Sequence, residues 1–207
     1  MSVALVAAAV FVSTVGSAVA LRAETTGNSS IVNGISTDAM LSAAILSGPG
    51  ERYRLRLHHL HTGEDLDVVY KVGNQYVPTA LAQLNHFLRD HRTEDVSHYD
   101  PKEFDVLHQV MSKLGKPNGI IDIVCGYRTP WSNNMLRTRA AVTGVAEHSQ
   151  HMLAKAIDIR VPGIRTRTLR DVALSLHEGG VGYYPVSQFV HVDVGPVRTW
   201  SFGGRGD

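Results

Sequence analysis

Two segments in the second half of the chain place histidine and carboxylate side chains where they could hold a metal ion. The first segment, Ser149–Ile159 (SQHMLAKAIDI), contains His151 and ends in a strand-like pattern. Side chains alternate along a strand, so Asp158 faces the side opposite to the isoleucines that flank it. Aspartate is a poor strand former, and its place in this strand indicates a functional reason.

The second segment, Phe189–Val194, alternates between apolar and polar residues. Its valines share one face, and His191 and Asp193 share the other, with Cα atoms about 6.6–7 Å apart. His151 and Asp158 together with His191 form a three-ligand set of the kind that zinc accepts, at about 2.0–2.2 Å, with the fourth position left for water. The pattern therefore predicts a single zinc ion that lowers the pKa of this water towards about 7.

A third segment supplies an arginine. Cys125–Pro130 (CGYRTP) follows a predicted buried strand, Ile120–Val124, and its glycine and proline predict a tight exit. A guanidinium fixed at such a strand end binds a carboxylate or stabilises a developing oxyanion. We therefore expect Arg128 to be catalytic and to bind substrate together with Asn134 and Tyr183. The alternatives are a plain salt bridge for Arg128 and ordinary strand packing for Tyr183.

These motifs resemble those of the LAS superfamily of zinc peptidases, which comprises lysostaphin-type enzymes, D-Ala-D-Ala metallopeptidases and the hedgehog fold. Ser149–Asp158 is similar to the motif S-x-H-x-x-G-x-A-x-D, and G-Y-R-T-P-x-x-N resembles an element of the D-Ala-D-Ala branch. The tail Gly179–Trp200 resembles the exported bacterial group that includes murein endopeptidase K. Each motif alone is weak evidence, but the three follow the family order over residues 51–200.

The resemblance implies that His151, Asp158 and His191 bind zinc and that Arg128 anchors the substrate or the oxyanion. It implies an α+β fold of the hedgehog or D-Ala-D-Ala-peptidase type, with a central antiparallel sheet, flanking helices and an N-terminal β-hairpin. It also implies hydrolysis of peptide cross-links or stem peptides of peptidoglycan, such as bonds of D-amino acids or of meso-diaminopimelate.

Two positions depart from the family pattern. Ala154 replaces the motif glycine, and Gln188 stands three residues before the last histidine, where several branches carry the catalytic base. Glutamine cannot act as a base. Asp193 is the replacement candidate, and its alternative role is to orient a histidine ligand. The alternative function is a non-catalytic peptidoglycan-binding module with a hedgehog-like fold, and a third is hydrolysis of a non-murein peptide or amide.

Hydrophobic periodicity predicts the elements that position these residues. Alternation over Tyr53–His58 and Leu66–Tyr70 predicts a β-hairpin. Apolar stripes predict helices after Pro78 and after Pro101, and a third helix opened by a capping box at Thr168. The further strands expected are Ile120–Val124, Ala156–Val161, Val181–Tyr184 and Phe189–Val194.

The N-terminus indicates export. Residues 1–20 contain an apolar run, Val3–Val12, followed by small residues that end in an A-x-A pattern at Ala20. The alternative is a single membrane anchor over Val3–Leu21. We expect residues 21–50 to be a loose linker and residues 51–203 to form the zinc peptidase domain, located in the periplasm or cell envelope.

Composition limits the partners and the ligands. The 207 residues carry 20 basic and 19 acidic side chains, a formal charge of +1, which argues against a nucleic-acid-binding protein. The single cysteine, Cys125, excludes a cysteine-rich metal site, which leaves histidines and carboxylates as ligands. A peptidoglycan peptide is the expected partner, with no membrane span beyond the signal segment. We expect the hairpin histidines His58, His59 and His61 to be solvated, with an accessory metal site as the alternative.

Overall fold

The structure is a computed structural model of the chain and describes residues 31–32, 35–139 and 143–203. The predicted export signal, residues 1–20, lies outside the described residues, as does the first part of the predicted linker. Within the described part, no helix combines the length and the apolar character that a bilayer span requires.

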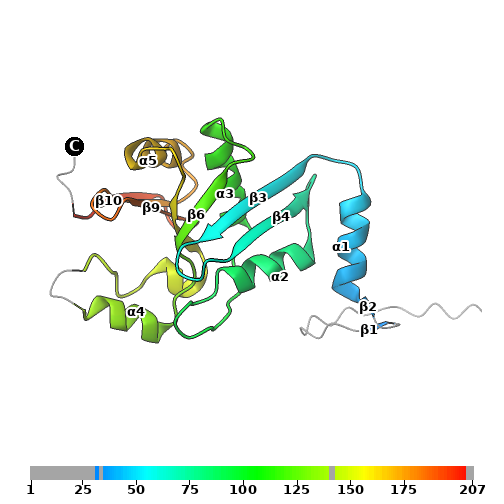
Figure 1. Cartoon of the computed structure of the whole chain (residues 1–207), viewed down its shortest axis with the longest axis horizontal. Coiled ribbons are helices and arrows are strands. Elements are labelled where there is room, and N and C mark those ends of the chain that lie inside the picture. The colour runs from blue at the N-terminus through cyan, green and yellow to red at the C-terminus, as the bar shows by residue number, and fades with distance from the viewer. Residues whose placement is uncertain (1–30, 33–34, 140–142, 204–207) are drawn as a thin grey trace, which may run out of the picture.

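An eight-stranded sheet forms the centre of the molecule (Figure 1). Its strands are β3 (Arg52–His59), β4 (Asp65–Val72), β5 (Gln75–Tyr76), β6 (Ile120–Cys125), β7 (Ala156–Arg160), β8 (Gly180–Tyr184), β9 (Phe189–Asp193) and β10 (Arg198–Ser201). They lie in the order β10-β8-β9-β7-β6-β3-β4-β5. A separate pair joins β1 (Ile31–Val32) to β2 (Ile35–Ser36).

The sheet is mixed. The predicted hairpin of β3 and β4 is present, and β7, β8 and β9 pair antiparallel as expected. The expectation of an antiparallel sheet is wrong for two pairs, because β3 pairs parallel with β6 and β8 pairs parallel with β10. A parallel pair needs a long crossover, and the chain between β4 and β6 supplies one with its two helices.

The helices are α1 (Thr37–Ser47), α2 (Pro78–Phe87), α3 (Lys102–Lys113), α4 (Pro130–Arg137) and α5 (Thr166–Leu174), with a 3₁₀ helix η1 (Gln150–Leu153). The predicted helices after Pro78 and Pro101 are confirmed. The predicted capping box is wrong, because α5 begins at Thr166 and its N-cap, Arg165, makes no side-chain capping bond. Figure 1 shows α1 at one end of the molecule and α4 and β10 at the other.

Helix α1 contradicts the prediction of a loose linker for part of residues 21–50. The hydroxyl of Ser36 caps it by accepting a hydrogen bond from the Ala39 backbone nitrogen at 3.1 Å. The helix contacts α2, where the Ser42 hydroxyl accepts a hydrogen bond from the Thr79 backbone nitrogen at 3.0 Å. Tertiary contact therefore stabilises a segment whose sequence shows no amphipathic stripe.

Strand alternation separates the core from the candidate site. On one face, isoleucines and valines of the central strands are buried with residues of α2, α3 and α5; the fully buried strand residues include Leu57, Ile121, Ile123, Ile157, Ile159 and Val190. Asp158 and His191 alternate with these residues and so face the other side of the sheet. The apolar packing thereby fixes the strands that carry the site.

Neighbouring isoleucines of β6 test this alternation. Ile121 is completely buried, whereas Ile120 is 39% exposed. We expect Ile121→Ala to lower the free energy of unfolding by about 2–5 kcal/mol, because it leaves a cavity. Ile120→Ala is the matched control and should cost less than about 1 kcal/mol. Urea denaturation measures both values, and equal losses would contradict the observed orientation of β6.

Candidate metal centre and its pocket

The pairing of β7 with β9 places Asp158 directly opposite His191. The same row continues on the neighbouring strands, with Cys125 opposite Asp158 and Gly182 opposite His191. A shift in register between Ile123 and Cys125 puts two residues of β6 opposite one of β7. Such a bulge turns Cys125 towards the row that carries the candidate ligands.

Gly182 makes room for an aromatic ring next to the histidine. Trp200 is the partner of Gly182 on β10, and a Cβ atom at position 182 would lie 2.6 Å from the Trp200 ring. The ring centroids of Trp200 and His191 are 5.0 Å apart. Trp200 therefore shields one side of the histidine.

The short helix η1 and the segment after β6 fix His151. The Ser149 hydroxyl accepts a hydrogen bond from the His151 backbone nitrogen at 3.3 Å, and Ala154 ends the helix in the left-handed conformation, with φ of 50°. Left-handed backbone favours glycine, which explains the glycine in the related motif. The His151 ring donates from Nδ1 to the Gly126 carbonyl at 2.7 Å, which leaves Nε2 as an electron-pair donor.

Three candidate ligand atoms meet at this point. His151 Nε2 lies 3.2 Å from Asp158 Oδ1 and 3.1 Å from His191 Nδ1, and the last two atoms are 2.9 Å apart. The three residues are at most 7% exposed. The structure thus brings together His151, Asp158 and His191, as the sequence predicts.

The protonation of these groups favours a cation among them. Burial and the nearby Arg128 lower the pKa of His151 to about 4, so its ring is neutral at pH 7. Burial opposes charge on His191, but hydrogen bonds with Asp158 and Asp193 outweigh it and raise the pKa of His191. The Asp158 carboxylate thus favours a positive charge at this point of the site. A divalent ion that accepts nitrogen and oxygen ligands, such as zinc, would suit this donor set of one neutral imidazole, a second imidazole and a carboxylate.

Cys125 lies next to the ligands. One ligand atom from each of Cys125, His151 and Asp158 lies within 4.8 Å of the others. Burial raises the pKa of the Cys125 thiol to about 12, so the side chain is a neutral thiol at pH 7. Cys125 is thus a buried, neutral neighbour of the candidate ligands.

Asp193 lies behind His191. Its Oδ2 accepts a hydrogen bond from His191 Nε2 at 2.9 Å, and Arg198 donates to both carboxylate oxygens, at 2.7 and 3.1 Å. The backbone nitrogens of Gly180 and Gly195 also donate to Oδ1. The residue is only 1% exposed. The sequence left two roles open for Asp193, general base and orientation of a histidine ligand. These contacts favour the second role.

A pocket of about 420 Å³ opens beside the three candidate ligands. Arg128 lines it and is held by the Asn133 side chain, whose Oδ1 accepts a hydrogen bond at 3.3 Å. Arg128 Nε is buried without a hydrogen bond, and no carboxylate of the described residues pairs with this guanidinium. A buried cation that has no acidic partner is suited to binding an anionic ligand.

Known proteins resemble this chain over most of its length. The sequence model of a peptidase family, described as peptidoglycan L,D-endopeptidase MepK, matches residues 48–200. The chain belongs to this family. It is 43% identical over 159 residues to the peptidoglycan L,D-endopeptidase MepK of Escherichia coli K12, which covers 76% of this chain and 84% of that protein. The probable peptidoglycan L,D-endopeptidase MepK of Haemophilus influenzae is 40% identical over 157 residues, 76% of this chain and 83% of its own. No solved structure matches.

Within this MepK family member, two predicted substrate-binding residues do not line the pocket. The Arg170 guanidinium lies over the Tyr183 ring, with its Cζ atom 4.6 Å from the ring centroid. Tyr184 lines the pocket instead. Asn134 is exposed on α4, whereas Asn133 contacts Arg128. In both cases the neighbouring residue has the expected contact. A shift of one residue reverses the direction of the side chain on a strand, and it moves the side chain to another face of a helix.

Two further polar residues near the motifs also lie outside this pocket. Gln188 is exposed in the turn between β8 and β9, with φ of 57°, and does not line this pocket. His148 is exposed and does not line it either. The position that carries a base in related branches therefore contributes nothing to the pocket in this chain.

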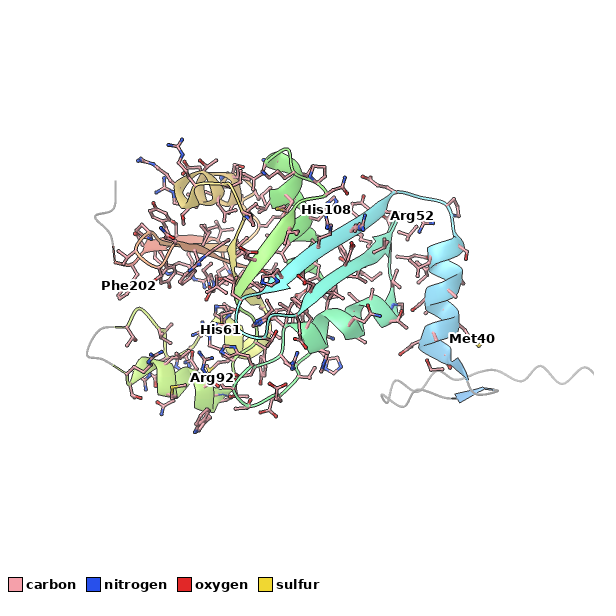
Figure 2. The ribbon with its side chains drawn as sticks, in the orientation of Figure 1. Met40, Arg52, His61, Arg92, His108 and Phe202 are labelled. Carbon is pink, nitrogen blue, oxygen red and sulfur yellow. The ribbon has the colours of Figure 1, made fainter. Side chains whose placement is uncertain are left out.

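The sequence also missed part of the pocket wall. His61, His91 and Arg92 line it from the hairpin turn and from the loop after α2. Figure 2 labels His61 and Arg92, which lie in the same part of the molecule. His61 and His91 stack with ring centroids 4.2 Å apart, and His59 packs behind them. The prediction that the hairpin histidines are solvated is wrong for His59, which is fully buried. β3 pairs parallel with β6, so the turn that follows β3 lies at the same edge of the sheet as the segment after β6. The sequence did not indicate this parallel pairing.

Burial of His59 makes stability depend on pH. Burial, and then the neighbouring His61, lower its pKa to about 4, compared with about 6.5 in the unfolded chain. The unfolded state therefore binds more protons between these values, and the free energy of unfolding falls as pH decreases from 6.5 to 4. His59→Gln should reduce this slope, because it removes up to about one proton from the difference in proton binding between the unfolded and folded states. Urea titrations at several pH values test it, with exposed His98→Gln as the control; an unchanged slope in His59→Gln would be inconsistent with a buried neutral imidazole.

Proposed function

We propose that this chain is an exported zinc metallopeptidase that hydrolyses peptide cross-links of peptidoglycan and acts as a murein endopeptidase in cell-wall remodelling. The family, and the activity in the names of its E. coli and H. influenzae relatives, support this assignment. The observation that carries it is the meeting of His151 Nε2, Asp158 Oδ1 and His191 Nδ1 within 3.2 Å beside a pocket.

The bond cleaved is proposed to be an L,D bond, as in the names of the relatives. In peptidoglycan such a bond joins the L centre of one diaminopimelate to the D centre of the next. A pocket of about 420 Å³ accommodates a few residues of an extended peptide. Peptidoglycan lies outside the cytoplasmic membrane, which agrees with the predicted export signal and a location in the periplasm or cell envelope.

His151, Asp158 and His191 would hold one zinc ion. When bound there, zinc supplies polarisation of a carbonyl group and a lowered pKa for water. The two histidines are oriented for this role by fixed acceptors, the Gly126 carbonyl for His151 and the Asp193 carboxylate for His191. Such partners fix the tautomer and the direction of each ring.

Arg128 contributes charge on the substrate side of the pocket. Its guanidinium is buried, is held at one end by Asn133, and has a free Nε. It would bind a carboxylate of the substrate or stabilise the oxyanion that develops at the scissile carbonyl. The backbone nitrogen of Arg128 also donates to the His151 carbonyl at 3.2 Å, so that the arginine and the ligand are fixed relative to each other.

A non-catalytic peptidoglycan-binding module is the second candidate. Among the described residues that line the pocket, Asp158 is the only carboxylate, and it belongs to the ligand set. The pocket therefore lacks a second acid in the place of a general base. This observation favours the binding module, and measurement of turnover separates the two functions.

The ligand set predicts linked losses of metal and activity. Wild-type protein should bind about one zinc per chain and release cleaved muropeptides from cross-linked sacculi, measured by metal analysis and by mass spectrometry. His151→Ala should lose stoichiometric zinc and lower turnover at least about 1,000-fold. His148→Ala, an exposed position outside the pocket, is the control. Full activity in His151→Ala would refute the site, and zinc binding by the wild type without turnover would favour the binding module.

Asp193→Asn separates its two possible roles. If Asp193 orients His191, the variant should bind zinc about 10–100-fold more weakly, while turnover at saturating zinc stays within about tenfold of wild type. Competition with a chelating dye measures the affinity, and circular dichroism shows whether the fold is retained. Asp171→Asn, at an exposed position on α5, serves as the control. Wild-type zinc affinity with turnover abolished would instead identify Asp193 as the base.

A further inference from the structure

A second arginine lines the pocket without an acidic partner. Arg92 lies in the loop after α2, and its Nη1 atom is buried and makes no hydrogen bond among the described residues. Arg128 Nε, in the same pocket, has the same property. Leaving a buried charged donor unsatisfied is costly, so the two guanidinium groups point to an anionic ligand that contacts both sides of the pocket.

One buried carboxylate fixes both arginines. Asp90 Oδ1 accepts a hydrogen bond from the Arg92 backbone nitrogen at 3.0 Å. Asp90 Oδ2 accepts from the backbone nitrogen and the hydroxyl of Thr129, at 2.8 and 2.9 Å, directly next to Arg128 in the chain. Asp90 is completely buried. Its carboxylate is occupied by these backbone and hydroxyl groups, so it joins the two segments without pairing with either guanidinium group.

The pocket is strongly positive outside the metal ligands. The described residues that line it include Arg92, Arg128 and Arg139, with Asp158 as the single carboxylate. The His61 and His91 rings, which also line the pocket, stack on each other with centroids 4.2 Å apart. Burial and the charge of Arg92 lower the pKa of His91 to about 4, so this ring is neutral at pH 7 and the positive charge of the pocket comes from the arginines.

We propose that Arg92 is a specificity-determining residue that binds a free carboxylate of the substrate next to the scissile bond. The inference rests on the proposed function and adds the recognition of charge to it. In an L,D cross-link between two diaminopimelates, each D centre carries such a carboxylate unless it is amidated. Arg92 thus selects the free acid over the amide, and Asp90 is the residue that positions it.

Two matched substrates test the proposal. They are cross-linked muropeptide dimers with an L,D bond, one with free diaminopimelate carboxylates and one in which these groups are amidated. The zinc-loaded wild-type protein should show a lower KM for the free acid. Arg92→Gln should raise the KM for the acid about 10–100-fold and leave kcat and the KM for the amide within about twofold.

Arg137→Gln is the matched control, because Arg137 is an exposed arginine of α4 outside the pocket. Asp90→Asn releases the segments of both arginines, so it should raise the KM for the acid more than the KM for the amide, because only the loss through Arg92 depends on the free carboxylate. If Arg92→Gln impairs both substrates equally, or neither, the proposal is overturned while the proposed function stands. If the wild type cleaves neither substrate and binds neither, both fail.

Discussion

The geometry of the candidate metal centre depends on the register between β7 and β9. Asp158 and His191 are cross-strand partners, and each alternates with apolar residues that are buried on the other face of the sheet. A slip of one residue would move the carboxylate or the imidazole into the core and expose isoleucine or valine. The hydrophobic effect that stabilises the sheet is therefore also the force that holds two ligands opposite each other.

The supporting contacts extend this constraint to the third ligand. His151 comes from a 3₁₀ helix, but its ring is bound to the Gly126 carbonyl and its own carbonyl to the Arg128 nitrogen. A Cβ atom at Gly126 would lie 2.5 Å from the Leu88 carbonyl oxygen, so the segment after β6 lies tight against the end of α2. The ligands are thus held before any ion binds, which reduces the reorganisation that binding requires.

Strand alternation and helical periodicity are local properties, and the sequence was informative where they apply. They predicted the hairpin, α2, α3 and the strands that carry Asp158 and His191. They failed where tertiary contacts decide: α1 has no amphipathic stripe, Tyr184 rather than Tyr183 lines the pocket, and Asn133 rather than Asn134 contacts Arg128. Arg92 and His91 had no recognisable motif, because the crossover that brings their loop to the pocket depends on the parallel pairing of β3 with β6.

The order of the elements along the chain has a consequence for biogenesis. β10 follows every other strand of the sheet, and it supplies both Trp200, beside His191, and Arg198, which neutralises Asp193. A polypeptide that emerges from its N-terminus can form the hairpin and its helices well before this strand is present. Hydrolytic competence would then be acquired last, so that an incomplete chain would not yet cleave its substrate.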